Sequence, residues 1–184
     1  MYNLMVTTFS LVLLWISSTQ VTRPVPSKSA DQTVQQFWSL ELSGARLTET
    51  GWIQTNAFFL RPIPWSPNQP LIVVSDKYLI DKIGQSPTSA DVYVGCTALG
   101  SVDSELRFKP SEVGGPLTQM VCKFSVALNE TKDWKIVTAP AGRRIGVGTA
   151  IRYVTEMLRQ TSDAQIRTNA QRTVAALKAL RGTA

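Results

Sequence analysis

Asp103 and Arg107 are the first residues in this chain whose types and spacing could serve a chemical role. They stand four residues apart, with Glu105 between them, in a segment whose apolar and polar residues alternate. Alternation predicts a β-strand, in which side chains four residues apart project to the same face. Asp103 and Arg107 could therefore frame a polar binding site. The alternative is a ladder of opposite charges on a solvent-facing strand.

Tyr93 is a second candidate, because it lies two residues after Asp91 on a predicted strand. A hydroxyl and a carboxylate on one strand face could act together in general acid–base catalysis. The chain has no histidine, which is the side chain that most often carries out this chemistry. We therefore treat Tyr93 as a candidate binding residue and predict no catalytic residue.

Arg143 and Arg144 lie in the segment Gly142-Arg143-Arg144-Ile145-Gly146-Val147-Gly148-Thr149, between a predicted strand and a predicted helix. Helix N-termini attract anions, so both arginines are candidates for binding an anion. The segment lacks the lysine of a nucleotide P-loop and the third glycine of a dinucleotide fingerprint. A flexible turn followed by a helix cap is the simpler interpretation.

The two cysteines, Cys96 and Cys122, each belong to an alternating segment and share a face with apolar residues. Both thiols are therefore expected in the core. If residues 103–109 formed a strand between them, Leu106 would neighbour both cysteines, which would stand about 9 to 10 Å apart. A disulfide requires Cα atoms within about 7 Å, so we expect two separate buried thiols and no disulfide.

The composition is that of an ordinary globular protein. Of the 184 residues, 43% are hydrophobic and 17% are charged, and the formal net charge is +6. This charge is modest for a nucleic-acid-binding protein, so we expect no nucleic-acid partner. Without histidine, and with only two cysteines, the chain offers no usual metal-binding cluster. No motif indicates a cofactor.

The N-terminal residues 4–16 are mainly apolar and are followed by small and polar residues. The run is shorter than the roughly 20 residues that a membrane-spanning helix requires, and it has the length of a secretory signal core. We expect residues 1–29 to be a signal peptide and linker, with the mature chain beginning between residues 18 and 29. The protein would then be exported to the periplasm or outside the cell. If the signal stayed uncleaved, it would be the chain's only membrane contact.

The rest of the chain predicts an α+β fold in which N-terminal helices pack on a curved antiparallel sheet, followed by two C-terminal helices. The predicted first helix covers residues 32–45, and Thr48 caps a shorter second helix. Strands are expected at residues 71–75, 78–83, 90–99, 103–109, 117–128 and 134–138. We divide this part into a domain at 30–140 and a helical extension at 141–184.

This order of elements, together with Phe37-Trp38, Leu106-Arg107-Phe108 and Trp134-Lys135-Ile136-Val137, resembles the cystatin-like, cone-shaped fold of nuclear transport factor 2. Within that fold it is similar to small exported bacterial proteins of unassigned function. The resemblance covers about residues 31–140. It implies a sheet wrapped around the first helix and a pocket at the open end of the cone. Enzymes of this fold generally use Asp, Tyr or an Asp–His pair there, whereas this chain has no histidine.

We therefore expect an exported, non-catalytic binding protein. It would hold a small apolar ligand or another envelope protein in the pocket of the cone or on its outer sheet face. One alternative is a small isomerase or hydratase that uses a carboxylate and a tyrosine. Another is a dimerisation or scaffold module of the cell envelope, which would form a homodimer. An apolar outer sheet face around Val121, Val137 and Tyr93 would favour that module.

The closing helix, predicted at residues 163–181, has an apolar stripe bordered by Arg167, Lys178 and Arg181. The stripe is narrow and contains no aromatic residue. We expect the helix to dock on its own domain. The alternative is contact with an anionic membrane surface or a partner helix.

Overall fold

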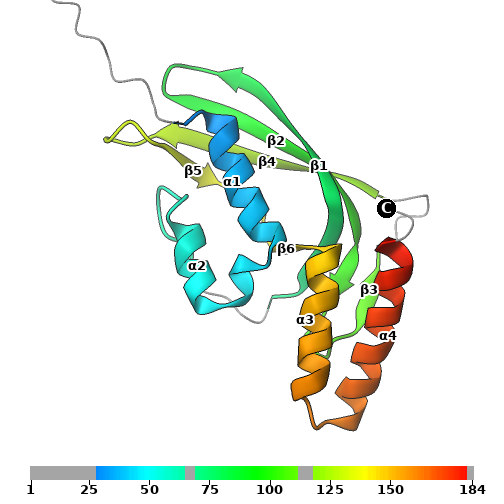
Figure 1. Ribbon diagram of the computed structural model, residues 1–184. Helices are drawn as coiled ribbons and strands as arrows, with labels where there is room; N and C mark the ends of the chain where they lie inside the picture. The colour runs from blue at the N-terminus through cyan, green and yellow to red at the C-terminus, as the bar shows by residue number, and fades with distance from the viewer. Residues whose placement is uncertain (1–27, 65–68, 112–117, 182–184) are drawn as a thin grey trace, which may run out of the picture.

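The computed structural model describes residues 28–64, 69–111 and 118–181. Within them a strongly curled sheet is combined with four α-helices (Figure 1). The helices are α1 (Ala30–Leu42), α2 (Glu49–Asn56), α3 (Val147–Gln160) and α4 (Ala164–Arg181), with a 3-10 turn η1 (Ala45–Leu47). The strands are β1 (Leu71–Gln85), β2 (Ser89–Val102), β3 (Phe108–Pro110), β4 (Thr118–Leu128), β5 (Trp134–Thr138) and β6 (Arg143–Gly146). The predicted signal core lies outside the described residues. No described helix has the length and apolar character needed to cross a membrane.

The strands follow the order β5-β4-β2-β1-β6, and β3 pairs with the end of β2. All neighbours are antiparallel except β1 and β6, which run parallel. The predicted α+β class is therefore confirmed, with the difference that the sheet is mixed. β6 falls in the predicted C-terminal extension, yet it hydrogen-bonds to the first strand of the sheet.

β1 is one long strand where the sequence predicts two. Its register against β2 shifts between Val74 and Tyr78, which makes a bulge at the residues that were expected to form a turn. Within the bulge the Ser75 hydroxyl accepts a hydrogen bond from the Lys77 N–H at 3.1 Å. This local bond turns the backbone without ending the strand.

The strand predicted at residues 103–109 is wrong for most of its length. The Asp103 carboxylate accepts hydrogen bonds from the N–H groups of Glu105 and Arg107, both at 3.0 Å, and Leu106 takes a left-handed φ of 58°. These local bonds make a turn, and only Phe108–Pro110 pair with β2. β4 therefore pairs directly with β2, so Leu106 does not separate the two cysteines.

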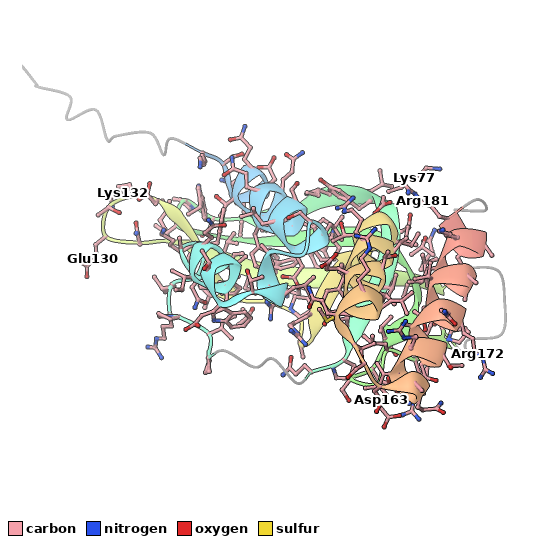
Figure 2. All side chains as sticks on the ribbon, turned by 60° about the horizontal axis from the view of Figure 1, so that its bottom comes forward. Lys77, Glu130, Lys132, Asp163, Arg172 and Arg181 are labelled. Carbon is pink, nitrogen blue, oxygen red and sulfur yellow. The ribbon has the colours of Figure 1, made fainter. Side chains whose placement is uncertain are left out.

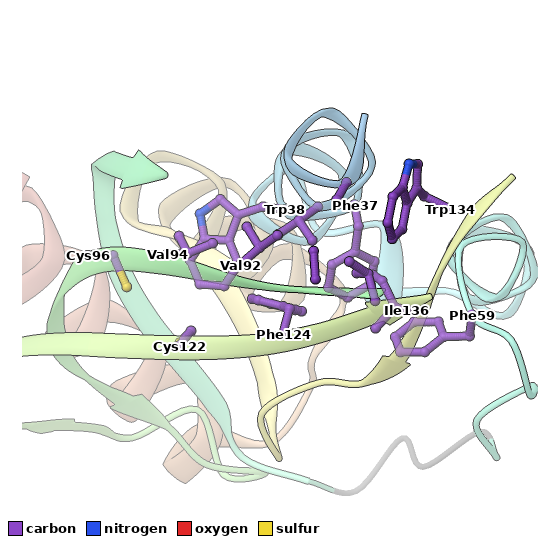
Figure 3. Close-up of a cluster of buried hydrophobic side chains, with 14 of the residues drawn as sticks. Phe37, Trp38, Phe59, Val92, Val94, Cys96, Cys122, Phe124, Trp134 and Ile136 are labelled. Carbon is purple, nitrogen blue, oxygen red and sulfur yellow. The ribbon is translucent and has the colours of Figure 1, made fainter. Parts of the chain in front are cut away.

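Helix α1 lies across the concave side of the sheet, and its side chains fill that side (Figures 1 and 3). The helix begins after Ser29, whose N–H donates to the Gln32 side chain at 3.0 Å, rather than after the predicted Asp31 cap. Phe37 and Trp38 are at most 2% exposed and contact Phe124 of β4 edge to face. This aromatic group is the centre of the first core.

A second core lies on the opposite face of the sheet, beneath the hairpin of α3 and α4. Val73 belongs to this core although its neighbour Val74 belongs to the first, because successive strand residues point to opposite faces. The second core contains Leu71, Val73, Leu99, Val102, Leu106, Ile145, Val147, Ala150, Val154, Ala170 and Leu177. The helical hairpin thus covers one part of the outer sheet face.

Helix α4 docks on its own domain, as the sequence predicts. Thr173 donates a hydrogen bond to the Leu106 carbonyl at 2.7 Å and accepts one from the Phe108 N–H at 2.9 Å. Leu177 is completely buried. Arg172, by contrast, points away from the body of the protein (Figure 2).

Candidate functional site

Asp103 and Arg107 come together as the sequence predicts, but in a turn between β2 and β3. Arg107 Nε lies 2.9 Å from the Asp103 carboxylate, and Arg107 Nη1 lies 3.1 Å from Glu105. Partial burial alone would raise the pKa of Asp103, but hydrogen bonds from the backbone and side chain of Arg107 outweigh it and lower that pKa. Arg107 also lines a cavity of about 280 Å³ between β3 and α4, together with Phe108 and Arg172. The contacts of Asp103 are those of a turn-forming ion pair.

Tyr93 lies on the outer face of β2, beside an ion pair that spans two strands. Lys123 Nζ is 2.8 Å from Asp91 and 5.8 Å from the centre of the Tyr93 ring. The Ser125 hydroxyl also donates to Asp91, at 2.9 Å. Hydrogen bonds from Lys123 and Ser125 lower the pKa of Asp91, which keeps this carboxyl ionised at neutral pH. An ionised, paired carboxylate is a weak proton donor and a weak base.

Arg143 and Arg144 are buried in β6, not held in the flexible turn that the glycines suggest. The Arg143 guanidinium donates to the carbonyls of Arg46 and Gln69. The Arg144 guanidinium donates to the carbonyls of residues 140–142 at 2.8 to 3.4 Å. These donors are directed at backbone carbonyls of the protein itself.

Glu41 and Arg46 form a buried ion pair at the end of α1. Arg46 Nη1 lies 3.0 Å from each Glu41 carboxylate oxygen, and its guanidinium stacks 4.6 Å from the centre of the Trp52 ring. The Arg144 N–H donates to the same carboxylate at 2.7 Å. Burial raises the pKa of Glu41, while the charge of Arg46 and this N–H act against the shift. The pair joins α1, η1 and β6, which indicates a structural role.

The candidate residues therefore lie in three separate surroundings. Tyr93 is on the outer sheet face, Asp103 and Arg107 are in a turn, and Arg143 and Arg144 are buried in β6. The structure does not place them around one site. Among the described residues, no group of three His, Cys, Asp or Glu residues could hold a metal ion.

The concave side of the sheet offers a cavity at its rim. It measures about 270 Å³ and is lined by Lys28, Phe58, Trp134 and Lys135, among others. These residues come from the segment just before α1, the segment after α2, and β5. The region deeper within the curl is occupied by the aromatic side chains of α1.

The outer face of the sheet carries an exposed apolar row where the α3–α4 hairpin does not cover it. Leu79 of β1 pairs with Gly95 of β2, and Gly95 pairs with Val121 of β4, so the three form a line across adjacent strands. Leu79 is 79% exposed and Val121 is 67% exposed. We call this line the apolar row. The sequence predicts Val121 on this face but not Leu79, because alternation does not reveal the register that places β1 and β4 on either side of Gly95.

A charged row lies next to the apolar row. Asp81 pairs with Tyr93, and Tyr93 pairs with Lys123, on the same outer face. Its two ends carry opposite charges with an aromatic ring between them. Val137 of β5 is also exposed, at 48%. The outer face near Val121, Val137 and Tyr93 is thus an accessible surface with apolar and charged parts.

A scan against protein-family models, a search of curated proteins and a search of solved structures each return no match. The likeness to nuclear transport factor 2 therefore stays a prediction.

Proposed function

We propose that the protein is an exported, non-catalytic binding protein and that the uncovered part of its outer sheet face is the contact surface. The observation that carries this proposal is the apolar row, in which Leu79 and Val121 are largely exposed. Single exposed apolar residues are common, but here two of them lie at the same level of the sheet with only Gly95 between them, which leaves a flat apolar surface suited to a contact. The apolar N-terminal residues 4–16 support export.

The contacts favour binding over an isomerase or hydratase. Asp91, two residues before Tyr93 on β2, is held ionised by Lys123 on an open face. Glu41 is buried, but both of its oxygens bond to Arg46. Neither carboxylate has the setting of a general acid or base in a pocket. The filled concave side likewise favours the outer face over the interior of the cone.

The occupant that best fits this surface is a second copy of the chain. Two sheets can stack face to face about a two-fold axis that lies between them and follows β2. This axis places β1 of one copy over β4 of the other. Leu79 then meets Val121 of the second copy, and Asp81 meets Lys123, while the Tyr93 rings approach each other. The charges at the two ends of the charged row make the surface complementary to itself.

Leu79→Asp is expected to raise the dissociation constant of the homodimer at least about tenfold, because it places a charge opposite the apolar Val121 of the second copy. Sedimentation equilibrium of protein beginning at residue 28 measures the effect over a range of concentrations. Ile53→Asp is the matched control, because Ile53 is also exposed, at 65%, but lies on α2. Ile53→Asp should leave the association constant unchanged.

The two-fold arrangement makes a sharper prediction. Leu79→Asp and Val121→Lys should each weaken the homodimer, and an equal mixture of the two variants should form a heterodimer. In that heterodimer the aspartate introduced at position 79 of one copy faces the lysine introduced at position 121 of the other. The second of the two equivalent contacts still joins the native Leu79 and the native Val121. A wild-type protein that remains monomeric up to millimolar concentration would contradict the second copy as occupant. Variants that do not complement each other would contradict the two-fold geometry.

A further inference from the structure

The two cysteines lie on the adjacent strands β2 and β4, which pair directly, so no strand with Leu106 separates them in the way that the sequence predicts. Cys96 pairs in register with Met120, and Val94 pairs with Cys122. The cysteines are therefore diagonal neighbours two residues apart on the same inward face of adjacent strands. Figure 3 shows both at the same end of the first core. We propose that Cys96 and Cys122 form a dithiol that a hydroperoxide oxidises to an intrachain disulfide.

The position of the two thiols supports this assignment. Both thiols are free and buried, and both belong to the first core. Diagonal neighbours on antiparallel strands have Cα atoms about 7 to 8 Å apart, with Cβ atoms closer. The reach of a disulfide is about 4.4 to 6.8 Å between Cα atoms. Formation of the disulfide therefore requires β2 and β4 to shift locally until the two Cα atoms lie within about 7 Å.

Arg144 supplies a positive charge on the same side of the sheet. It pairs in register with Ile72 of β1, whose side chain packs against the first core. Three backbone carbonyls of residues 140–142 hold its guanidinium in place. A fixed guanidinium near a thiol favours the thiolate, which is the reactive form of cysteine.

The two thiols consequently differ in acidity. The hydrogen bond from Cys96, together with Arg144, lowers the pKa of Cys122 to about 7 against the cost of burial. The pKa of Cys96 is raised, because its proton is shared with Cys122 and because the thiol is buried. Cys122 is therefore the nucleophile of the pair, and Cys96 is the thiol that completes the disulfide.

The reaction balances with one hydroperoxide for each pair. The Cys122 thiolate attacks one peroxide oxygen, the O–O bond breaks, and the products are a sulfenic acid on Cys122 and hydroxide, which takes up a proton to become water. The Cys96 sulfur then attacks the Cys122 sulfur, the S–O bond breaks, and the departing hydroxide takes the Cys96 proton as a second water. The two thiols lose two electrons in total, and the peroxide gains them.

Burial selects the class of oxidant. Cys122 is 1% exposed and Cys96 is 6% exposed. A bulky disulfide or an oxidoreductase domain must open the sheet to reach either sulfur. Hydrogen peroxide is close to water in size, so it requires a smaller opening of the sheet than either of these oxidants. The pair is therefore suited to small hydroperoxides rather than to exchange with large disulfides.

The experiment treats reduced full-length protein with hydrogen peroxide. The sample is then denatured without reductant, alkylated with N-ethylmaleimide, and weighed intact. Untreated protein should carry two labels. Treated protein should carry none, should be lighter by two hydrogen atoms, and should regain both labels after dithiothreitol. The oxidation rate should rise as the pH increases through about 7, because the Cys122 thiolate becomes populated there.

Two variants separate the roles of the cysteines. Cys96→Ser should stop at the Cys122 sulfenic acid, which dimedone traps, because the serine hydroxyl can still donate a hydrogen bond to Cys122 but cannot form a disulfide. Cys122→Ala should react at least about tenfold more slowly, because the pKa of an isolated buried thiol is high. Circular dichroism verifies that both variants are folded. Two labels after prolonged peroxide treatment of folded wild-type protein would overturn the proposal. A disulfide between two chains instead of within one would do the same.

Discussion

Glu41→Ala is expected to lower the free energy of unfolding by about 3–5 kcal/mol, the largest effect that we expect from one substitution in this protein. The substitution leaves the Arg46 charge buried without its partner, since both carboxylate oxygens bond to Arg46 Nη1. It also removes the acceptor of the Arg144 N–H. Urea denaturation followed by circular dichroism measures the change.

Two further variants test the reason for this loss. The double substitution Glu41→Leu with Arg46→Met removes both charges, and it should recover most of the stability that Glu41→Ala loses. Glu156→Ala is the matched surface control, because Glu156 pairs with Arg159 at 3.3 Å while about half exposed. It should cost less than about 1 kcal/mol. Equal losses in Glu41→Ala and Glu156→Ala would mean that the buried pair has no special role.

Truncation after Gln160 is expected to lower the melting temperature by about 10 °C or more, because it exposes the second core. The shortened chain lacks Leu177 and Ala170, which are completely buried. It also lacks Thr173, which bonds to the carbonyl of Leu106 and the N–H of Phe108. Differential scanning calorimetry measures the shift.

Two single substitutions in α4 test the same packing if the shortened chain does not fold. Leu177→Ala should destabilise by about 2–5 kcal/mol, whereas Lys178→Ala, one residue away and exposed, should be close to neutral. The affinity of the folded protein for anionic vesicles should be the same with either substitution. A stable truncated protein that had lost vesicle binding would instead support the membrane role of the basic border.

The amino-acid sequence predicts most of the helices and strands whose hydrophobic pattern is local. The alternation in the cysteine segments predicts β2 and β4, and the apolar stripe of residues 163–181 predicts α4 with its docked face. In both cases one face of the element is buried, so apolar residues recur with the period of that element, about 2 in a strand and 3.6 in a helix. The α+β class follows from the order of these elements.

The failures have two physical causes. The Asp103 carboxylate accepts hydrogen bonds from two nearby N–H groups, and the resulting turn replaces most of the strand that alternation predicts at residues 103–109. In β6 the residues Arg143 and Arg144 are buried, which hydrophobic patterns cannot predict, because the acceptors of the Arg143 guanidinium and of the Arg144 N–H come from distant segments. The apolar row could not be predicted for a similar reason. It joins residues that are far apart in the chain, and they become neighbours only through the register between the strands.

The long first strand has a consequence for how the protein unfolds. Val73 and Val74 are adjacent in β1, and each is fully buried in a different core. Neither core can lose its packing without disturbing the strand that the other requires. The molecule should consequently unfold in one cooperative transition, with the slowest amide hydrogen exchange in β1 and β2, and residues 141–181 should not melt as a separate unit.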